Sequence, residues 1–245
     1  MKLFLTFLLI FVSSNSQSEH LVIGHRGAKG HTAENTLASI KKAMELGADG
    51  IEVDVFRCLT GEIVLFHDKK LDRLTNGTGM IESKSLEELK KLKVLESNEG
   101  IPTLNEVFEI IDNNTFLNIE LKGSNTAKLS LEIVKEQINN NKILHKNILF
   151  SSFNWKELED LRKIDDNIKI ALVTENDPLD AIEPALTLKA VAINPSYKTL
   201  NKKVVDEIFK AGLKIYTWTV NNKNQIDKMK KLGVNGIITD YPERI

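Results

Sequence analysis

The chain has 245 residues, of which 42% are hydrophobic and 27% are charged. This length and composition predict one globular domain with a sizeable core, and they exclude a disordered, collagen-like or membrane-bundle protein. The 33 Lys and Arg residues nearly balance the 34 Asp and Glu residues, and the net charge of −1 provides no overall basic field for nucleic acid or an anionic membrane. The single cysteine, Cys58, excludes an intramolecular disulfide.

The first residues have the features of a secretory signal peptide. Lys2 precedes an almost wholly apolar stretch over residues 3–12, and a short polar stretch with Ser14-Asn15-Ser16 follows it. This stretch is shorter than the roughly 20 residues that span a bilayer, and no lipid-attachment cysteine follows it. We therefore expect a cleaved signal peptide over residues 1–16, a mature domain over 17–245, and a secreted or periplasmic protein without stable membrane insertion. A retained membrane anchor is the alternative.

From residue 21 onward, short β-branched apolar runs alternate with longer stretches of helical period, which is typical of βα units around a parallel sheet. Amphipathic stretches predict helices at residues 36–46, 104–112, 129–140, 155–164, 202–211 and 224–232. Eight apolar runs predict strands, and they favour a (β/α)8 TIM barrel over an open sheet, since no GxGxxG follows the first run. The runs are Leu21–Gly24, Gly50–Phe56, Phe116–Leu121, Asn147–Ser152, Ile168–Val173, Ala190–Asn194, Leu213–Thr219 and Gly236–Thr239.

Two intervals depart from this alternation. An additional alternating run at Glu62–His67 predicts a hairpin extension of the second strand. It begins a small insertion over about residues 57–115, with a helix near Ser85–Leu92. Only residues 241–245 follow the eighth run, so we expect the last helix of the ring to be truncated or missing.

Catalytic groups of such a barrel lie at the carboxyl ends of its strands. Buried parallel strands have no structural need for carboxylates, because an unpaired buried charge is strongly disfavoured. Polar residues nevertheless interrupt or end four of the predicted strands. They are His25, Arg26, Glu52, Asp54, Glu120, Lys122 and Trp218.

The three carboxylates suggest a metal site. Glu52 and Asp54 are two residues apart on a strand, so their side chains point to one face ~7 Å apart. Glu120 comes from the next strand of the barrel. Three such charges repel one another unless a cation holds them, and hard oxygen ligands favour Mg²⁺ or Ca²⁺ over zinc. A structural network of ion pairs with Arg26 and Lys122 is the alternative.

Two histidines suggest acid-base chemistry. His25 ends the first predicted strand, and His67 ends the Glu62–His67 run beside Asp68, which could orient its ring. Acid-base catalysis near neutral pH needs one group that takes a proton and one that gives a proton. Arg26 and Lys122 would then hold an anion. Hydrogen-bonded structural histidines are the alternative.

A set of short motifs along the chain resembles the glycerophosphodiester phosphodiesterase family in order and spacing. The resemblance covers nearly all of residues 21–242. The motifs are His25-Arg26-Gly27-Ala28-Lys29-Gly30, Ala33-Glu34-Asn35-Thr36, Glu52-Val53-Asp54-Val55, His67-Asp68, Leu71-Asp72-Arg73-Leu74-Thr75-Asn76-Gly77-Thr78-Gly79, Asn118-Ile119-Glu120-Leu121-Lys122, Ser151-Ser152-Phe153, Thr217-Trp218-Thr219-Val220-Asn221 and Thr239-Asp240-Tyr241-Pro242.

This resemblance implies a TIM barrel with a small insertion after the second strand, and hydrolysis of glycerophosphodiesters to glycerol 3-phosphate and an alcohol. By the same resemblance, one divalent cation is held by three carboxylates, two histidines are the acid-base pair, and two cationic side chains bind the phosphate. The chain departs from the family at Ala33, where proline is usual, and at residues 192–195, where a histidine is often found. The implied roles are metal ligation by Glu52, Asp54 and Glu120, acid-base catalysis by His25 and His67, and substrate binding by Arg26, Lys122 and Trp218.

Two rival functions remain open from the sequence. The first is lysophospholipase D-type cleavage of lysophospholipids on the same fold, and the second is a secreted protein that binds phosphodiesters without turnover. The sequence leaves open the head group, the choice between Ca²⁺ and Mg²⁺, a cyclic phosphate intermediate, and the oligomeric state.

Overall fold

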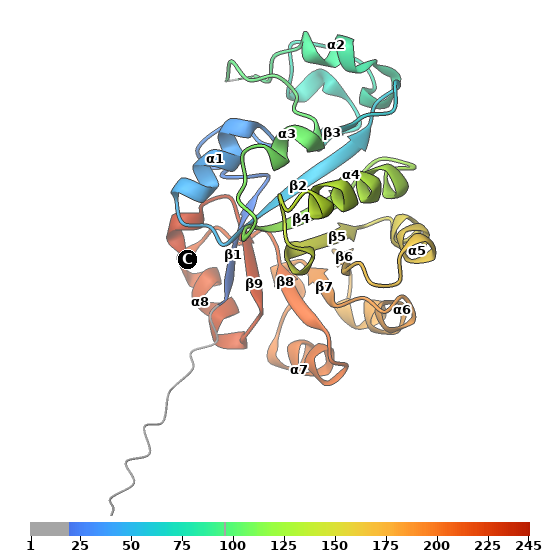
Figure 1. Ribbon diagram of the computed structural model, residues 1–245. Coiled ribbons are helices and arrows are strands. Elements are labelled where there is room, and N and C mark those ends of the chain that lie inside the picture. The colour runs from blue at the N-terminus through green and yellow to red at the C-terminus, as the bar shows by residue number, and fades with distance from the viewer. Residues whose placement is uncertain (1–19, 96) are drawn as a thin grey trace, which may run out of the picture.

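A computed structural model describes residues 20–95 and 97–245 and contains a closed barrel of eight parallel strands (Figure 1). The predicted signal peptide over residues 1–16 lies outside the described residues. Pairing of the first strand with both the second and the last closes the ring, which confirms the predicted TIM barrel. The barrel strands are β1 (Leu21–His25), β2 (Gly50–Arg57), β4 (Phe116–Leu121), β5 (Ile148–Ser152), β6 (Ile170–Thr174), β7 (Ala192–Pro195), β8 (Lys214–Thr217) and β9 (Gly236–Thr239).

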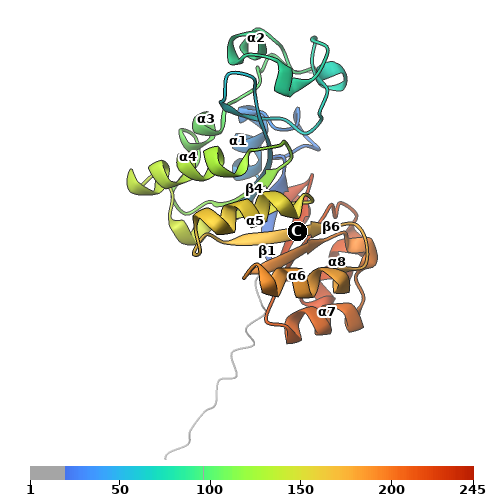
Figure 2. The same cartoon turned by 90° about the vertical axis from the view of Figure 1, so that its right-hand side faces the viewer.

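Helices between the strands cover the outside of the barrel (Figure 2). Polar caps begin several of them. Thr36 accepts a hydrogen bond from Ser39 N at the first helix, and Asn201 does the same for Val204 N. The covering helices are α1 (Leu37–Glu45), α3 (Leu104–Phe108), α4 (Ala127–Asn139), α5 (Trp155–Ile164), α6 (Ile182–Thr187), α7 (Lys202–Lys210) and α8 (Lys223–Leu232).

The last helix of the ring is reduced, as expected. After β9, the described chain forms only a 3-10 turn over Pro242–Arg244, and Ile245 packs against the main core. The helices predicted over residues 104–112 and near Ser85–Leu92 are shorter than expected: the first ends at Phe108, where residues 109–110 form a turn, and the second covers only residues 86–90. In the described residues, no helix is long and apolar enough to cross a membrane.

The insertion between β2 and β4 has a small core of its own. Strand β3 (Ile63–Leu65) pairs antiparallel with β2, which confirms the predicted hairpin extension, and helix α2 (Leu86–Lys90) follows it. Ser85 and Glu88 form a capping box at this helix. The insertion stands beside one end of the barrel in both views (Figures 1 and 2). The buried residues of this small core are Phe56, near the end of β2, and Cys58, Val64, Phe66, Leu71, Ile81, Leu89, Val94 and Ile101.

Candidate active site

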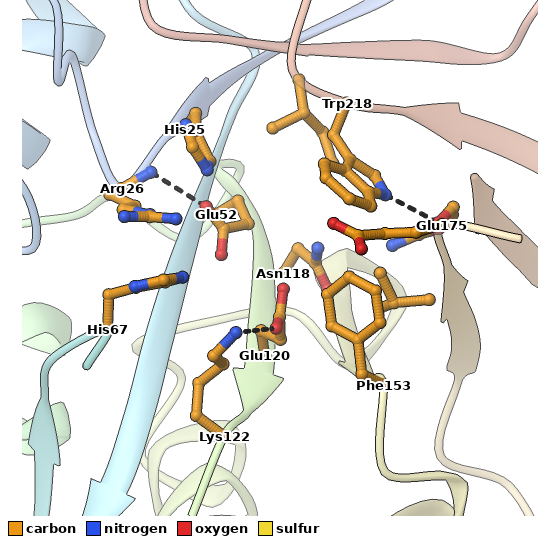
Figure 3. Close-up of a pocket in the computed structure, with 13 residues that line it drawn as sticks. His25, Arg26, Glu52, His67, Asn118, Glu120, Lys122, Phe153, Glu175 and Trp218 are labelled. Atoms are coloured by element: carbon orange, nitrogen blue, oxygen red, sulfur yellow. Dashed lines mark hydrogen bonds and ion pairs between the residues drawn. The ribbon is translucent and has the colours of Figure 1, made fainter. Parts of the chain in front are cut away.

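The predicted polar residues meet in one cavity of about 500 Å³ at the carboxyl ends of the barrel strands (Figure 3). Strands β1, β2 and β4 and the end of the β2–β3 hairpin supply most of them. Asp54 is the exception, because it is buried and does not line the cavity itself. The predicted residues that line the cavity are His25, Arg26, Glu52, His67, Glu120, Lys122 and Trp218.

Glu52, Asp54 and Glu120 form a compact acidic group. Strand register explains their proximity, since Asp54 on β2 is the partner of Glu120 on β4. One carboxylate oxygen of each residue lies within 4.8 Å of those of the other two. Glu52 and Asp54 are only 3% and 1% exposed, so water screens their repulsion poorly. This geometry matches the predicted group of three carboxylates that could hold a metal ion.

The protonation of the acidic group reflects this crowding. Burial, followed by the charges of Asp54 and Glu120, raises the pKa of Glu52 well above its ordinary value. Burial and Asp54 likewise raise the pKa of Glu120 to about 7. Glu52 Oε1 is buried and has no hydrogen-bond partner in the described chain. An unsatisfied buried oxygen beside two further carboxylates is chemically suited to a hard cation.

Two cationic side chains pair with part of the acidic group. Arg26 Nε lies 3.1 Å from Asp54 Oδ2, and Lys122 Nζ donates to Glu120 Oε1 at 2.9 Å. The ion-pair network weighed as an alternative therefore exists, but it is incomplete. Among the described residues, Glu52 accepts a single hydrogen bond, from the backbone N–H of Arg26 at 2.9 Å. Three carboxylates thus face two cationic side chains, and the network leaves room for a metal ion.

The turn after β1 fixes Arg26 beside the acidic group. Arg26 and Gly27 have positive φ angles of 52° and 83°. A Cβ atom on Gly27 would lie 2.4 Å from the backbone carbon of Ser39, so a glycine is needed there. Glu34 accepts from Arg26 Nη1 at 2.6 Å, and Asn35 exchanges side-chain and backbone hydrogen bonds with Asp54. These two contacts give the Ala33-Glu34-Asn35-Thr36 motif a positioning role that sequence reasoning did not assign.

Each predicted catalytic histidine is held by a carboxylate. His25 Nδ1 lies 2.6 Å from Asp240 Oδ1, and Asn221 Nδ2 donates to the other oxygen of Asp240 at 2.6 Å. His67 Nδ1 lies 2.6 Å from Asp68 Oδ1, as predicted for that pair. A carboxylate at Nδ1 favours the tautomer with the proton on Nδ1 and leaves Nε2 available to the cavity.

Both imidazoles have a lowered pKa. Burial is the largest cause for His25, and it outweighs the hydrogen bond to Asp240, which acts in the opposite direction. Burial is also the largest cause for His67, against the charge of Asp54 and the hydrogen bond to Asp68. Both rings are therefore mostly neutral near pH 7, and a neutral Nε2 can accept a proton.

The opposite wall of the cavity is aromatic and polar (Figure 3). The rings of Phe153 and Trp218 meet edge to face with centroids 5.4 Å apart, and Trp218 Nε1 donates to Asn194 O at 2.8 Å. Asn118 and Asn194 each have a buried Oδ1 with no hydrogen-bond partner among the described residues. Because both line the cavity, these oxygens can accept hydrogen bonds from a ligand.

Sequence reasoning missed several residues of this site. Asn118 is two residues before Glu120 on β4, so alternation along the strand could have placed it in the same cavity. Asp240 directly follows β9, so its place at a strand end could have brought it to the cavity, but its contact with His25 joins positions 215 residues apart and only the structure shows it. The further residues without a predicted role are Glu34, Asn35, Phe153, Glu175, Asn194 and Asn221.

Comparison with known sequences gives consistent results. The profile of the glycerophosphoryl diester phosphodiesterase family matches residues 25–244. A glycerophosphodiester phosphodiesterase of Caldanaerobacter subterraneus subsp. tengcongensis is 40% identical over 92% of this chain and 96% of its own length. A glycerophosphodiester phosphodiesterase of Bacillus altitudinis is 36% identical over 91% and 95%, respectively.

Solved structures agree in fold and extent. A phosphodiesterase of Oleispira antarctica, solved in complex with the product sn-glycerol-3-phosphate, has a TM-score of 0.85 and 31% identity over 92% of this chain and 94% of its own. A glycerophosphodiester phosphodiesterase of Thermotoga maritima has a TM-score of 0.76 and 28% identity over 92% and 96%. The barrel, its polar cavity and these matches together establish that the chain belongs to the glycerophosphoryl diester phosphodiesterase family and is a phosphoric diester hydrolase.

Proposed function

We propose that this enzyme hydrolyses water-soluble glycerophosphodiesters, such as glycerophosphocholine and glycerophosphoethanolamine, to sn-glycerol 3-phosphate and an alcohol. One observation carries the proposal. A single cavity holds three carboxylates suited to a cation, two cationic side chains for a phosphate, and two histidines whose Nδ1 atoms are already engaged by carboxylates.

We assign a divalent cation, Ca²⁺ or Mg²⁺, to Glu52, Asp54 and Glu120. Oxygen ligands alone favour these hard ions. When bound, such an ion polarises a phosphoryl oxygen and offsets negative charge that develops in the transition state. Arg26 and Lys122 border the same acidic group and would hold the remaining phosphate oxygens.

His25 and His67 would move the protons. In this assignment one neutral imidazole takes the proton of the attacking hydroxyl group on Nε2. The other imidazole must carry a proton on both nitrogens at the start of the cycle, and it gives its Nε2 proton to the oxygen of the departing alcohol. The P–O bond to the alcohol breaks as the new P–O bond forms. The attacking group is either water or the glycerol 2-hydroxyl, and the second route passes through a cyclic phosphate.

The aromatic wall of the cavity favours a substrate with a small cationic head group. Figure 3 shows the Glu175 carboxylate pointing into the cavity on the side of Trp218 and Phe153. A carboxylate beside an aromatic ring such as that of Trp218 attracts the ammonium group of choline or ethanolamine. In the insertion, Ile81 and Leu89 are fully buried, whereas Leu59, Met80 and Leu95 are exposed, so the preference for a soluble substrate rests on the head-group side of the cavity and not on the insertion.

A direct assay tests the activity and separates it from the lysophospholipase D alternative. Purified enzyme is incubated with glycerophosphocholine and either Ca²⁺ or Mg²⁺, and both choline and glycerol 3-phosphate are measured. The value of kcat/KM is then determined for glycerophosphocholine and for monomeric lysophosphatidylcholine below its micelle threshold. We expect a higher kcat/KM for the deacylated diester. A consistently higher value for the lysophospholipid would favour the alternative.

Variants test the residue assignments. His25→Ala and His67→Ala should each lower kcat by ~10²-fold or more while the protein remains folded by circular dichroism. Glu175→Gln should lower kcat/KM for glycerophosphocholine more than for glycerophosphoglycerol, whose head group is neutral. Wild-type turnover in a folded His67→Ala variant would return His67 to a structural role.

We also propose that the enzyme is exported to the periplasm or the medium. The support is the basic residue Lys2 followed by the apolar stretch over residues 3–12. The mass of the protein recovered from the envelope and medium of the expressing cells tests this. A mass equal to that of residues 17–245 would agree with export and cleavage. Recovery of the uncleaved protein in the cytoplasm would contradict the proposal.

A further inference from the structure

A second cavity, of about 430 Å³, opens at the opposite end of the barrel. Lys169 directly precedes β6, Lys214 begins β8, and Lys146 lies two residues before β5. Because all barrel strands are parallel, these positions gather at the amino ends of the strands, away from the catalytic cavity. That end of a TIM barrel ordinarily serves stability rather than catalysis, so a built cavity there calls for an explanation.

The lysines of this cavity are not neutralised by the protein. Within residues 20–95 and 97–245, no carboxylate lies within 4.0 Å of any of their amino groups. Other lysines of the chain do find such partners, for example Lys135 with Asp165 at 2.7 Å and Lys142 with Glu109 at 3.2 Å. The cavity therefore concentrates positive charge in a chain whose net charge is only −1.

Local contacts hold this charge in place. Lys169 Nζ donates to the carbonyl oxygen of Lys146 at 2.6 Å, which fixes its amino group beside the cavity. Burial, together with the charges of Lys214 and Lys146, lowers the pKa of Lys169. Asp49, an acid that lines the cavity, already accepts a hydrogen bond from the backbone N–H of Val22 at 2.8 Å. With three lysines and one aspartate, the lining of this cavity has a net charge of +2.

The floor of the cavity is apolar. The rings of Phe116 and Tyr216 lie with centroids 5.6 Å apart, and Tyr216 is only 5% exposed. Leu149 is buried beside them in the same cluster. This floor can bury the carbon part of a ligand whose charged group reaches the lysines.

We propose that this cavity binds a phosphate monoester, with the phosphate held by Lys146, Lys169 and Lys214 and the organic part lying on Phe116 and Tyr216. A phosphate monoester dianion balances the two excess positive charges, and lysine amino groups bind phosphate as point charges. The same chemistry could come from a soluble ester or from the headgroup of phosphatidic acid. The proposal does not depend on the reaction at the catalytic cavity.

Lysine labelling read out by mass spectrometry tests the proposal residue by residue. The native protein undergoes reductive dimethylation alone, with phenyl phosphate, or with vesicles of phosphatidylcholine that do or do not contain phosphatidic acid. We expect phenyl phosphate to slow labelling of Lys146, Lys169 and Lys214 by ~5-fold or more, which corresponds to about 1 kcal/mol. The exposed Lys203 and Lys228 serve as unprotected controls, and Lys122 reports separately on binding at the catalytic cavity.

A paired variant strengthens the test. Lys169→Met with Lys214→Met keeps the aliphatic stems, should remove most of the ~5-fold protection of Lys146 by phenyl phosphate, and should leave glycerophosphocholine hydrolysis unchanged. The matched control is Lys203→Met with Lys228→Met. Protection by phosphatidic acid vesicles alone would identify the lipid as the source of the phosphate. Unchanged labelling of all three lysines with every probe would overturn the proposal.

Discussion

His25 and His67 are oriented in the same way although they come from different parts of the barrel. A carboxylate binds Nδ1 of each ring, and a further polar group fixes that carboxylate. Asn221 holds Asp240, while Arg73 Nε donates to Asp68 Oδ2 at 2.6 Å. Such outer contacts set the tautomer and basicity of an imidazole. The site thus contains two similar histidine–carboxylate pairs.

Asp240→Asn tests this positioning role. The carboxylate raises the pKa of His25 through its hydrogen bond, so its loss should move the limb of the pH–rate profile that depends on His25 to lower pH. We also expect kcat to fall by ~10-fold or more with little change in KM. Steady-state kinetics across the pH range provide both readouts. A lower kcat with an unshifted profile would point to a purely structural contact.

At the scale of elements, one buried side chain joins two neighbouring helices. Helices α4 and α5 lie side by side, and Glu157 of α5 reaches the start of α4. There it accepts from the backbone N–H groups of Asn125, Thr126 and Ala127 at 2.8 to 3.0 Å. A helix start has unpaired N–H groups, so a carboxylate from the next helix caps it in place of a local side chain.

Glu157→Ala should therefore be strongly destabilising. It leaves several buried donors without a partner, and we expect the free energy of unfolding to fall by about 2–3 kcal/mol. Chemical denaturation monitored by circular dichroism measures the change. Glu159→Ala, on an exposed position of the same helix, is the matched control and should change stability by less than about 0.5 kcal/mol. Equal losses in the two variants would contradict the capping role.

Sequence periodicity identified the elements wherever many buried residues repeat. The predicted bounds of β4, β9 and α5 match those observed, because continuous apolar runs or a clear helical face mark them. Helix α6 was not predicted, since it buries only Ala185 and contains Pro184, which gives little helical signal. The pairing of Glu157 with α4 and of Asp240 with His25 depends on distant contacts, and no local pattern contains that information.

At the scale of the molecule, the metal site couples ligand binding to protonation. Both carboxyl groups have an ordinary pKa of 4.5, which is raised in the fold, to about 7 for Glu120. Without metal, Glu52 and Glu120 therefore stay protonated at pH values at which they would ionise in the unfolded chain. The folded chain then binds more protons than the unfolded chain through these groups, so their contribution to stability falls as pH rises towards 7. A cation reverses this effect, because it binds the deprotonated carboxylates.

The stabilisation by added Ca²⁺ or Mg²⁺ should thus increase with pH. We expect a larger rise in Tm at about pH 8 than at about pH 5, because at lower pH the cation must displace protons. Glu52→Gln should remove most of the metal-dependent rise and, without metal, should be at least as stable as the wild type at the higher pH. Differential scanning calorimetry with and without EDTA measures these shifts. A metal effect independent of pH would contradict the assignment.

Closure of the barrel between β1 and β9 has a consequence for refolding experiments. His25 and its partner Asp240 stand on the two sides of this closure, so a chain in which the two strands have not yet paired cannot present the oriented imidazole. Contacts between such distant positions form slowly compared with local helices. After dilution from denaturant, the recovery of turnover therefore follows the pairing of β1 with β9. Far-ultraviolet circular dichroism follows the earlier formation of the surrounding helices.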